Sequence, residues 1–387
     1  MTAPAPVEIA HFNHAGTSIP PPAVVEQVVA HLELEARVGG YEAGEMADAA
    51  HEAVFDALAT LLGAGRDEVV PVESATRACE LLLWSTALSR AWGRGDRVVV
   101  DRFAYASTWA TLLRLQAVTG VEVAVAASGE DGAVDPARVV DVVDDRTRLV
   151  LVTHVPTHVG TVSDVGAVGA ALAGRDVVYA VDVSQSLGQL PIDVARIGCQ
   201  AAFAPGRKFL RAPRGTGVLF VSKALAETLV PLSADSTSAS IEVSSFDLAA
   251  GARRFDPFEH SLALRLGLGE AARHAVSHGL ERIADEVRAR SDAVAGVVES
   301  TDGLALVVPR PLSGIVSCTH AQLDPDTVKD RLRAVGVNCW VSSVGGSPLD
   351  QADRLPMPSV RLSPHYTTTD RDLEALARAL ALLNDAR

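Results

Sequence analysis

The stretch VVYAVDVSQSLGQLPIDV, residues 177–194, carries the clearest fold signal in the chain. It opens with a short apolar run that ends in an acidic residue, Asp182. A continuous apolar run of this length predicts a strand that is buried on both faces of a sheet. Open α/β sheets bind their ligands beyond the carboxyl ends of such strands. We therefore expect Asp182 to lie at a ligand site.

Further β-rich runs surround this stretch and alternate with helical patterns at 77–90 and from residue 108 onward. The runs are DEVVPVE (67–73), DRVVVD (96–101), VEVAVAA (121–127), TRLVLVTH (147–154) and GVLFVS (217–222). This alternation predicts an α/β domain with a mainly parallel sheet covered by helices on both faces. Polar residues at the strand ends, among them Ser74, Asp101 and His154, should converge on one crevice with Asp182.

The rest of the chain predicts a connecting helix and a small α+β unit. Helical spacing runs from residue 261 to about residue 300, with Gly279 as a break. Beyond it we expect strands in 303–309, 314–320, 336–343 and 359–364 and helices at 325–334 and 369–383. The predicted division is an N-terminal arm and large domain at 1–260, with a core at about 45–255, followed by the connecting helix and small domain at 261–387.

Composition narrows the class of partner. The 387 residues are 48% hydrophobic and 21% charged, and the formal charge of -14 argues against a nucleic-acid or anionic-membrane partner. There is no basic, apolar leader and no apolar run of about 18 residues, so we expect a cytoplasmic protein with a small-molecule substrate. The four cysteines form no CxxC pair and should be reduced. His274 and His278 lack a third ligand, so we expect no metal.

Lys208, in GRKFL (206–210), supplies a second ionisable group close to the Asp182 strand. A buried carboxylate needs a partner, and a protonated pyridine nitrogen would supply one and act as an electron sink. Burial lowers the pKa of a lysine, which suits imine formation and proton transfer. Spacing alone does not decide between this arrangement and a turn-capping Asp with a surface Lys in the basic loop 207–214.

These segments together resemble the class V aminotransferase group of fold type I enzymes that use pyridoxal 5'-phosphate (PLP). That group includes cysteine desulfurases, isopenicillin N epimerase-like proteins and ergothioneine-pathway C–S lyases, and the resemblance covers most of the chain. It implies a seven-stranded, mainly parallel sheet in the large domain, a smaller α+β domain and a homodimer with shared active sites. It also implies PLP as a Schiff base on Lys208, with Asp182 on the pyridinium nitrogen and Gln185 on the phenolic oxygen.

Other segments extend the implied cofactor site. ESATRACE (73–80) resembles the phosphate-binding turn, which assigns Ala75 and Thr76 to the phosphate; taken alone, Thr76 is equally a helix N-cap. DRFAYASTW (101–109) places Tyr105 where relatives stack a ring on the cofactor, and a core tyrosine is the alternative. Thr157 falls at the position where relatives place an Asn or Ser near the phenolic oxygen of the cofactor.

The substrate side is implied by further motifs. SVRLSPHY (359–366) resembles the segment whose Arg binds the substrate α-carboxylate, here Arg361, with a solvated Arg as the alternative. Tyr41 and His154 are also expected to bind substrate, and Tyr41 lies in a segment that reaches the active site partly from the neighbouring subunit. Relatives carry a hydroxyl shortly before the lysine where this chain has Ala-Pro-Gly at 204–206, so Arg207 is expected to compensate by charge.

The predicted reaction follows from what the motifs lack. Desulfurases need a nucleophilic Cys on the loop before the Arg361 segment, but SSVGGSPLDQ (342–351) contains none. β-Elimination from an S-substituted cysteine or its sulfoxide needs no Cys, and it yields a thiol or sulfenate with pyruvate and ammonia. The motifs EARVGGY, GRKFL, APRG and RLSPH are similar to hercynylcysteine sulfoxide lyases. We therefore expect a PLP-dependent C–S lyase in thiol or natural-product metabolism.

Other outcomes stay open at this point. Epimerisation or transamination at Cα, and decarboxylation-coupled oxidative deamination to an aldehyde, use the same cofactor and the same family scaffold. A PLP-fold regulator without catalysis is a further alternative, which the joint presence of Asp182, Gln185 and Lys208 disfavours. A nicotinamide enzyme is disfavoured because no GxGxxG follows the first strand.

Overall fold

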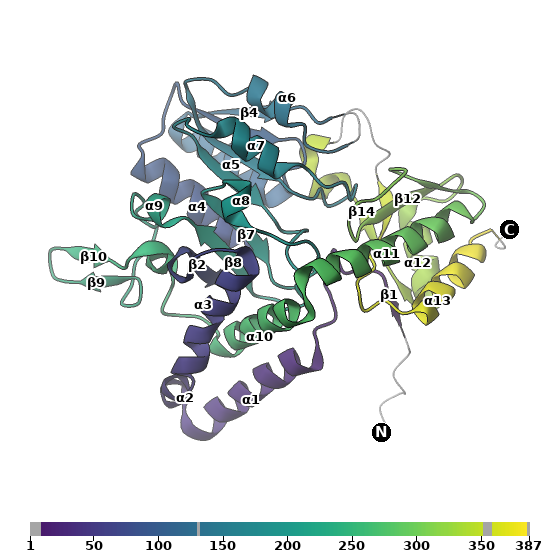
Figure 1. Ribbon diagram of the computed structural model, residues 1–387, viewed down its shortest axis with the longest axis horizontal. Coiled ribbons are helices and arrows are strands. Elements are labelled where there is room, and N and C mark those ends of the chain that lie inside the picture. The colour runs from purple at the N-terminus through teal and green to yellow at the C-terminus, as the bar shows by residue number, and fades with distance from the viewer. Residues whose placement is uncertain (1–8, 130–131, 351–357, 385–387) are drawn as a thin grey trace.

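A seven-stranded sheet forms the centre of the computed structural model, which describes residues 9–129, 132–350 and 358–384 (Figure 1). The strand order is β2-β8-β7-β6-β5-β3-β4, and only β8 runs antiparallel to its neighbours. The strands are β2 (Val69–Val72), β3 (Arg97–Asp101), β4 (Glu122–Ala126), β5 (Thr147–Thr153), β6 (Val178–Asp182), β7 (Ala201–Pro205) and β8 (Gly217–Val221). The expected mainly parallel sheet is confirmed, with β7 added between β6 and β8.

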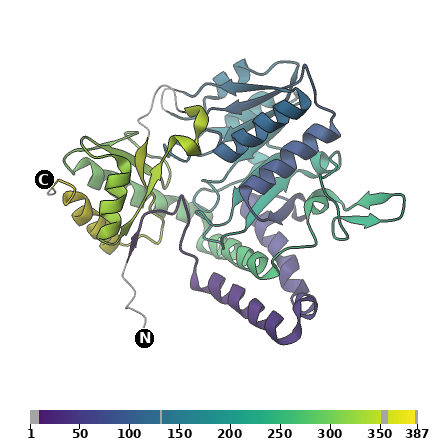
Figure 2. The ribbon, with the colours of Figure 1, turned by 180° about the vertical axis from the view of Figure 1, so that it is seen from behind.

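Both faces of the sheet are covered because successive strand side chains point to opposite sides. On β6, Tyr179 and Val181 join one apolar core, and Val178 and Ala180 join the other. Figure 1 shows α7 and α8 in front of the sheet, and Figure 2 shows α4 and α5 in front of its other face. The first core includes residues of α3 (Asp48–Leu62), α6 (Pro136–Asp141), α7 (Val165–Leu172), α8 (Val194–Ile197) and α10 (Leu262–His278), and the second includes residues of α4 (Ala75–Ser89), α5 (Ala106–Thr119) and α9 (Lys223–Ala226).

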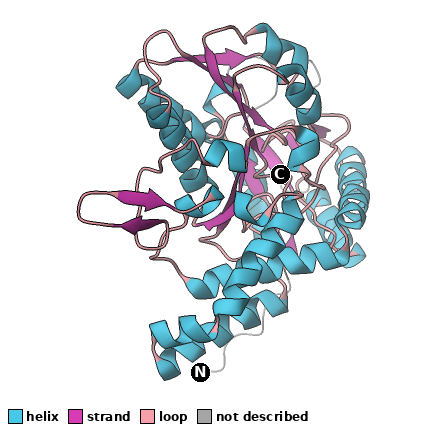
Figure 3. Ribbon diagram, turned by 60° about the vertical axis from the view of Figure 1, so that its left-hand side comes forward, coloured by secondary structure: helices cyan, strands magenta, loops and turns pink. Residues whose placement is uncertain are grey.

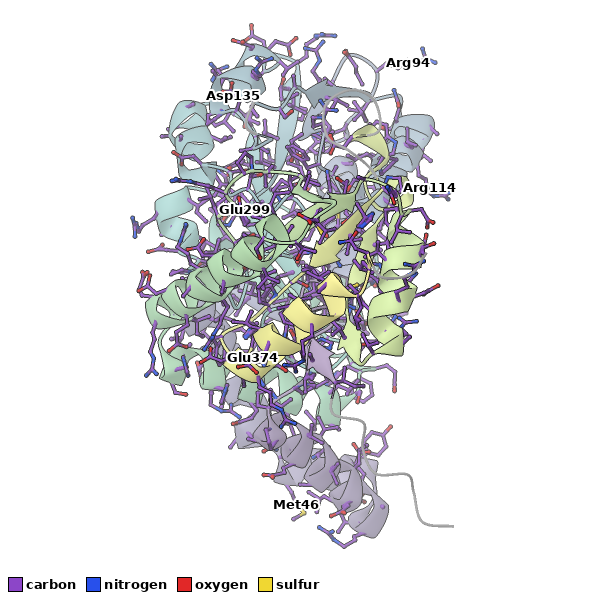
Figure 4. All side chains as sticks on the ribbon, turned by 90° about the vertical axis from the view of Figure 1, so that its right-hand side faces the viewer. Met46, Arg94, Arg114, Asp135, Glu299 and Glu374 are labelled. Carbon is purple, nitrogen blue, oxygen red and sulfur yellow. The ribbon has the colours of Figure 1, made fainter. Side chains whose placement is uncertain are left out.

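Two segments project from the large domain. Helices α1 (Pro22–Val38) and α2 (Gly40–Met46) extend beneath it, with α1 packed on α10, and Figure 4 shows Met46 at the tip of this projection. The hairpin of β9 (Ala239–Ile241) and β10 (Phe246–Leu248) stands away from the body (Figure 3). Within the described ranges, no helix is long and apolar enough to cross a membrane.

Helix α10 leads into α11 (Leu280–Glu299), which reaches the small domain. The expected break at Gly279 is confirmed; its φ of 95° favours glycine. The small domain has an antiparallel sheet in the order β11-β12-β15-β14. Its elements are β11 (Leu304–Leu306), β12 (Val316–His320), β14 (Trp340–Ser342), β15 (Ser359–Leu362), α12 (Pro325–Ala334) and α13 (Asp370–Ala381).

The N-terminal arm joins the small domain. Strand β1 (Ala10–His11) pairs in parallel with β13 (Val337–Asn338), and Phe12 is buried in the small-domain core. The sequence division had grouped this arm with the large domain. The pairing comprises only two residues on each strand, too few for a recognisable strand pattern.

Aromatic side chains fill the junction between the arm, the Lys208 loop and the small domain. The ring of His365 lies 4.8 Å from that of His14 and 4.4 Å from that of Tyr366, and its Nε2 lies 2.9 Å from the carbonyl O of Phe209. Burial lowers the pKa of His365 to about 3 and holds the pKa of His14 well below its usual value. Both imidazoles are therefore neutral in the folded protein.

We expect the free energy of unfolding to fall as the pH drops below about 6.5. The pKa of His365 is about 3 in the folded chain and 6.5 ordinarily, so the unfolded chain binds the additional proton in this window. The contribution of His365 to the free energy of unfolding is fully present above pH 6.5. It is reduced by about 2 kcal/mol at pH 5 and declines further toward pH 3. Urea unfolding at several pH values measures this loss. In His365→Gln the dependence should be shallower; an unchanged dependence would contradict the assignment.

Candidate active site

Two adjoining cavities lie beyond the carboxyl ends of the parallel strands. The inner cavity, of about 340 Å³, contacts the ends of β5, β6 and β7, and the outer cavity, of about 540 Å³, extends toward the small domain. The residues that line both are Tyr105, Thr157, Arg207, Lys208 and Arg214. The expected convergence of strand ends therefore produces a site of the size of ordinary ligand pockets.

Asp182 lies at the end of β6 and lines the inner cavity. Its Oδ1 accepts a 2.8 Å hydrogen bond from the backbone N–H of Ser184, so it also caps a turn. Burial raises the pKa of this carboxyl, while the Ser184 contact and the charge of Lys208 oppose the rise. A cationic N–H in the cavity would favour the ionised form of Asp182.

Lys208 lies in the tight loop between β7 and β8. The N–H of Gly206 donates to the carbonyl of Thr216 at 2.8 Å, and a Cβ at Gly206 would meet the Thr216 Oγ1 at 2.4 Å, so glycine is needed there. Burial lowers the pKa of Lys208 to about 7, although Asp182 opposes the shift. The amine is thus substantially neutral near physiological pH, as imine formation requires. The surface-lysine alternative does not describe this side chain.

The first turn of α4 borders the same cavity. Ser74 is the N-cap, because its side chain accepts a 3.1 Å bond from the N–H of Arg77, so the N-cap interpretation of Thr76 is wrong. Ala75 and Thr76 line the cavity within this first turn, where backbone N–H groups have no intrahelical acceptor and attract anions. The Thr76 hydroxyl donates to Ser107 at 3.1 Å. Ser107 was not identified from the sequence, although it lies two residues after Tyr105.

Tyr105 precedes α5 and lines both cavities with 45% of its surface exposed, so it is not a core tyrosine. The Lys208 Nζ lies 5.8 Å from the centroid of its ring. On another side of the inner cavity, the Gln185 Nε2 donates to the Thr157 Oγ1 at 2.7 Å and to the carbonyl of Ala15 at 3.1 Å. These contacts place an aromatic face and a polar pair around the lysine.

Arg361 lies on β15 of the small domain, is buried and lines the outer cavity. Its Nη1 donates to the carbonyl and to the Oγ1 of Thr157, at 2.9 and 2.8 Å. Its buried Nε has no partner among the described residues. Burial lowers the pKa of Arg361 to about 10, so it remains cationic. The solvated-Arg alternative is wrong, and an unused donor remains for a carboxylate.

Arg207 lines both cavities beside the lysine. Its Nη1 donates to the carbonyl of Gly16 on the N-terminal arm. Burial lowers the pKa of Arg207, and the like charge of Arg214 lowers it further. The segment 204–206 offers no hydroxyl to bind an anion. The other guanidinium donors of Arg207 can bind one in its place.

Two expected substrate residues lie outside these cavities. Thr153 and Val155 line the inner cavity, whereas His154 between them lines neither, because alternating side chains point to opposite sides. The His154 Nδ1 lies 2.9 Å from the Ser186 Oγ, and burial lowers its pKa to about 4. Tyr41 is 77% exposed on α2 and lines neither cavity of its own chain. A substrate role for Tyr41 thus requires a second subunit.

A buried charge cluster holds the loop that closes the outer cavity. Asp350 pairs with the Arg102 Nε at 2.9 Å and with the His158 Nε2. Arg102 and His158 belong to the large-domain loops that also carry Tyr105 and Thr157, while Asp350 ends the segment 343–350 of the small domain. Removing one member of such a buried pair leaves an uncompensated charge. No sequence signal identifies this cluster, because its members come from distant segments.

The cysteines are unsuited to nucleophilic chemistry. All four are free and buried, and none of the described residues lining the two cavities is a cysteine. Burial raises the pKa of each thiol to about 12, namely Cys79, Cys199, Cys318 and Cys339. A thiol of this pKa supplies almost no thiolate at neutral pH.

The inner cavity fits PLP. The buried carboxyl of Asp182, which Ser184 contacts, suits a pyridinium N–H, and the Lys208 amine beside it is partly neutral near pH 7. The start of α4 offers backbone donors for a phosphate, and Tyr105 offers a ring face.

Comparison with known proteins agrees with this geometry. A family model described as Aminotransferase class-V matches residues 10–376. A probable cysteine desulfurase from Methanothermobacter thermautotrophicus is 30% identical over 332 residues, which cover 84% of this chain and 81% of that protein. A probable hercynylcysteine sulfoxide lyase from Mycobacterium tuberculosis is 29% identical over 381 residues, covering 97% and 90%.

A solved structure shares the architecture over nearly the whole length. The apo structure of a cysteine desulfurase from Thermococcus onnurineus NA1 superposes with a TM-score of 0.89 at 21% identity, covering 98% of this chain and 96% of the other. The chain therefore belongs to the class-V aminotransferase family and is a PLP-dependent enzyme of fold type I.

Proposed function

We propose that this enzyme is a C–S lyase that cleaves an S-substituted cysteine, or its sulfoxide, by β-elimination. The net reaction consumes one water and releases a thiol or sulfenate with pyruvate and ammonia. The observation that carries the proposal is the combination of Lys208 and Arg361 around cavities whose described lining contains no thiol. We assign the reaction to thiol or natural-product metabolism.

Arg361 binds the substrate α-carboxylate in this proposal, because its buried Nε is an unused donor in the outer cavity. That contact orients the Cα–H bond toward the Lys208 Nζ, which takes the proton. The bound cofactor supplies the electron sink for the carbanion at Cα. Since the pKa of Lys208 is about 7, the amine can both accept the proton and return it near neutral pH.

The remaining roles concern the cofactor. Asp182 would keep the pyridine nitrogen of the bound cofactor protonated, and Tyr105 would offer its ring face to the cofactor ring. Gln185 and Thr157 hydrogen-bond near the phenolic oxygen, since they already form a polar pair at that wall. Ala75 and Thr76 would bind the phosphate through donors in the first turn of α4. Arg207 would add a positive charge to this phosphate site.

The thiols favour elimination over desulfuration. A desulfurase transfers sulfur to a cysteine thiolate, and here each thiol is buried with a pKa of about 12. Elimination needs only that the sulfur leaves Cβ with the bonding electrons. Of the two relatives, the one named as a sulfoxide lyase therefore agrees better with this chain's residues than the one named as a desulfurase.

We also propose a homodimer with shared active sites. Val25, Val29 and Leu32 form an apolar stripe on α1 with 48%, 46% and 50% of their surfaces exposed, and Tyr41 follows on α2. Such a stripe on a surface helix favours burial against another subunit. A cytoplasmic location is likewise proposed, because the four cysteines are free.

Product analysis tests the reaction. Incubation with S-alkyl cysteine conjugates should release equal amounts of thiol and pyruvate, measured by mass spectrometry and a lactate dehydrogenase assay. An S-linked aldehyde with carbon dioxide and ammonia would instead indicate oxidative deamination. A D-enantiomer or a keto acid that retains the sulfur would indicate epimerisation or transamination. Any of these as the sole outcome would refute the lyase.

The pH dependence of cofactor attachment tests Lys208. With a pKa of about 7, its neutral fraction rises from about one tenth at pH 6 to about nine tenths at pH 8. The rate at which the apoenzyme develops the absorbance of the lysine–PLP imine should therefore rise about tenfold over this interval and then level off. Lys208→Arg should form no imine that borohydride can fix. A rate that keeps rising tenfold per unit above pH 8 would contradict the lowered pKa.

Light scattering after size exclusion tests the homodimer. The wild type should elute at twice the chain mass, and Val29→Glu combined with Leu32→Glu should shift it toward the monomer and remove most activity. Val118→Glu is the matched control, because Val118 is 61% exposed on α5. A monomeric wild type, or a double variant that stays dimeric, would refute the interface.

A further inference from the structure

The wall of the outer cavity carries an excess of positive charge. Arg207, Arg214 and Arg361 all line it, and no aspartate or glutamate is among its described lining residues. The acidic residues Glu73 and Asp182 contact only the inner cavity. A substrate in the outer cavity therefore meets cations without compensating carboxylates.

Arg214 has no assigned partner in this wall. It lies on the loop after Lys208, is exposed and lines both cavities. Within the described ranges its side chain makes no hydrogen bond and no ion pair. Its charge lowers the pKa of Arg207, because the two guanidinium groups repel each other. An anion between them would relieve this repulsion.

Two hydroxyls in the same wall are also unused. The Oγ atoms of Ser342 and Ser347 are buried without a hydrogen-bond partner among the described residues, and both residues line the outer cavity. Buried polar atoms in native proteins usually have partners, so these two indicate a missing acceptor. A carboxylate or another oxyanion accepts hydrogen bonds from both hydroxyl and guanidinium groups.

We infer that the substituent on the substrate sulfur carries an anionic group, which Arg214 binds with help from the Ser342 and Ser347 hydroxyls. This inference rests on the proposed lyase function, and it gives the substrate a second acid in addition to the α-carboxylate at Arg361. A substituent with a fixed positive charge fits this wall poorly. The other anion that Arg214 can reach is the cofactor phosphate, because Arg214 also lines the inner cavity.

A set of matched conjugates tests the charge preference. S-(2-Carboxyethyl)-, S-(2-carbamoylethyl)- and S-(2-aminoethyl)-L-cysteine have similar size and carry negative, neutral and positive ends. The carboxyethyl conjugate should exceed its carbamoyl isostere at least about tenfold in kcat/KM, with the aminoethyl conjugate weakest. Equal values for the carboxyethyl and carbamoylethyl conjugates would overturn the inference.

Variants at Arg214 separate the two sources of the anion. Arg214→Gln should bring the carboxyethyl and carbamoylethyl conjugates to within about threefold, Arg214→Lys should retain part of the preference, and PLP affinity of the apoenzyme should stay unchanged. Arg310→Gln, at another exposed arginine, is the control and should keep the full preference. If Arg214→Gln weakens PLP binding about tenfold and leaves the preference intact, Arg214 binds the phosphate and the inference is wrong.

A binding measurement distinguishes this inference from the lyase proposal. The concentration of each conjugate that half-saturates the change in cofactor absorbance reports binding without requiring turnover. If no conjugate yields pyruvate but the carboxyethyl form still binds at least about tenfold more tightly, the lyase fails and the anionic substituent stands. If pyruvate forms from all three conjugates with equal affinity, the lyase stands and the anionic substituent fails.

Discussion

The burial of Asp182 and Lys208 at one cavity is the constraint on which the rest of the site depends. Removing a carboxylate and an amine from water disfavours both charged forms, so the pKa of Asp182 rises and that of Lys208 falls to about 7. The neutral amine is the form that attaches a carbonyl cofactor. In the proposed complex, a ring N–H would then favour the ionised form of Asp182. The burial that is unfavourable for the pair alone thus prepares it for PLP.

The strand ends act together because buried contacts connect their loops. Asp101, at the end of β3, accepts hydrogen bonds from the N–H groups of Phe103 at 2.6 Å and Thr153 at 2.5 Å. Burial raises its pKa to about 6 although these donors oppose the shift. Asp101 lines neither cavity, yet it joins the loop that carries Tyr105 to the end of β5. The position of the Tyr105 ring therefore depends on a carboxylate that lines neither cavity.

What the sequence predicts well is local. Asp182, Gln185 and Lys208 lie within short motifs, and the strand pattern around them sufficed for the parallel sheet. Strand β7 was not separated from the lysine loop, because its five residues run directly into it. Contacts between distant segments left no pattern at all: the β1–β13 pairing and the cluster of Asp350, Arg102 and His158 exist only after folding. His154 was grouped with the substrate because strand ends were treated without regard to which side each side chain faces.

The outer wall, rather than the cofactor cavity, distinguishes this chain's proposed chemistry from desulfuration. A carbanion at Cα is common to every PLP outcome considered, so the sheet and its lysine do not choose among them. In our proposal the segment 343–350 decides between desulfuration and elimination. Asp350 holds this segment against Arg102 and His158. Because this segment presents glycines and serine hydroxyls instead of a thiol, no nucleophile there can attack the sulfur. In the proposed reaction the C–S bond breaks by expulsion from Cβ, and the proposed leaving group is one that the cationic wall accepts.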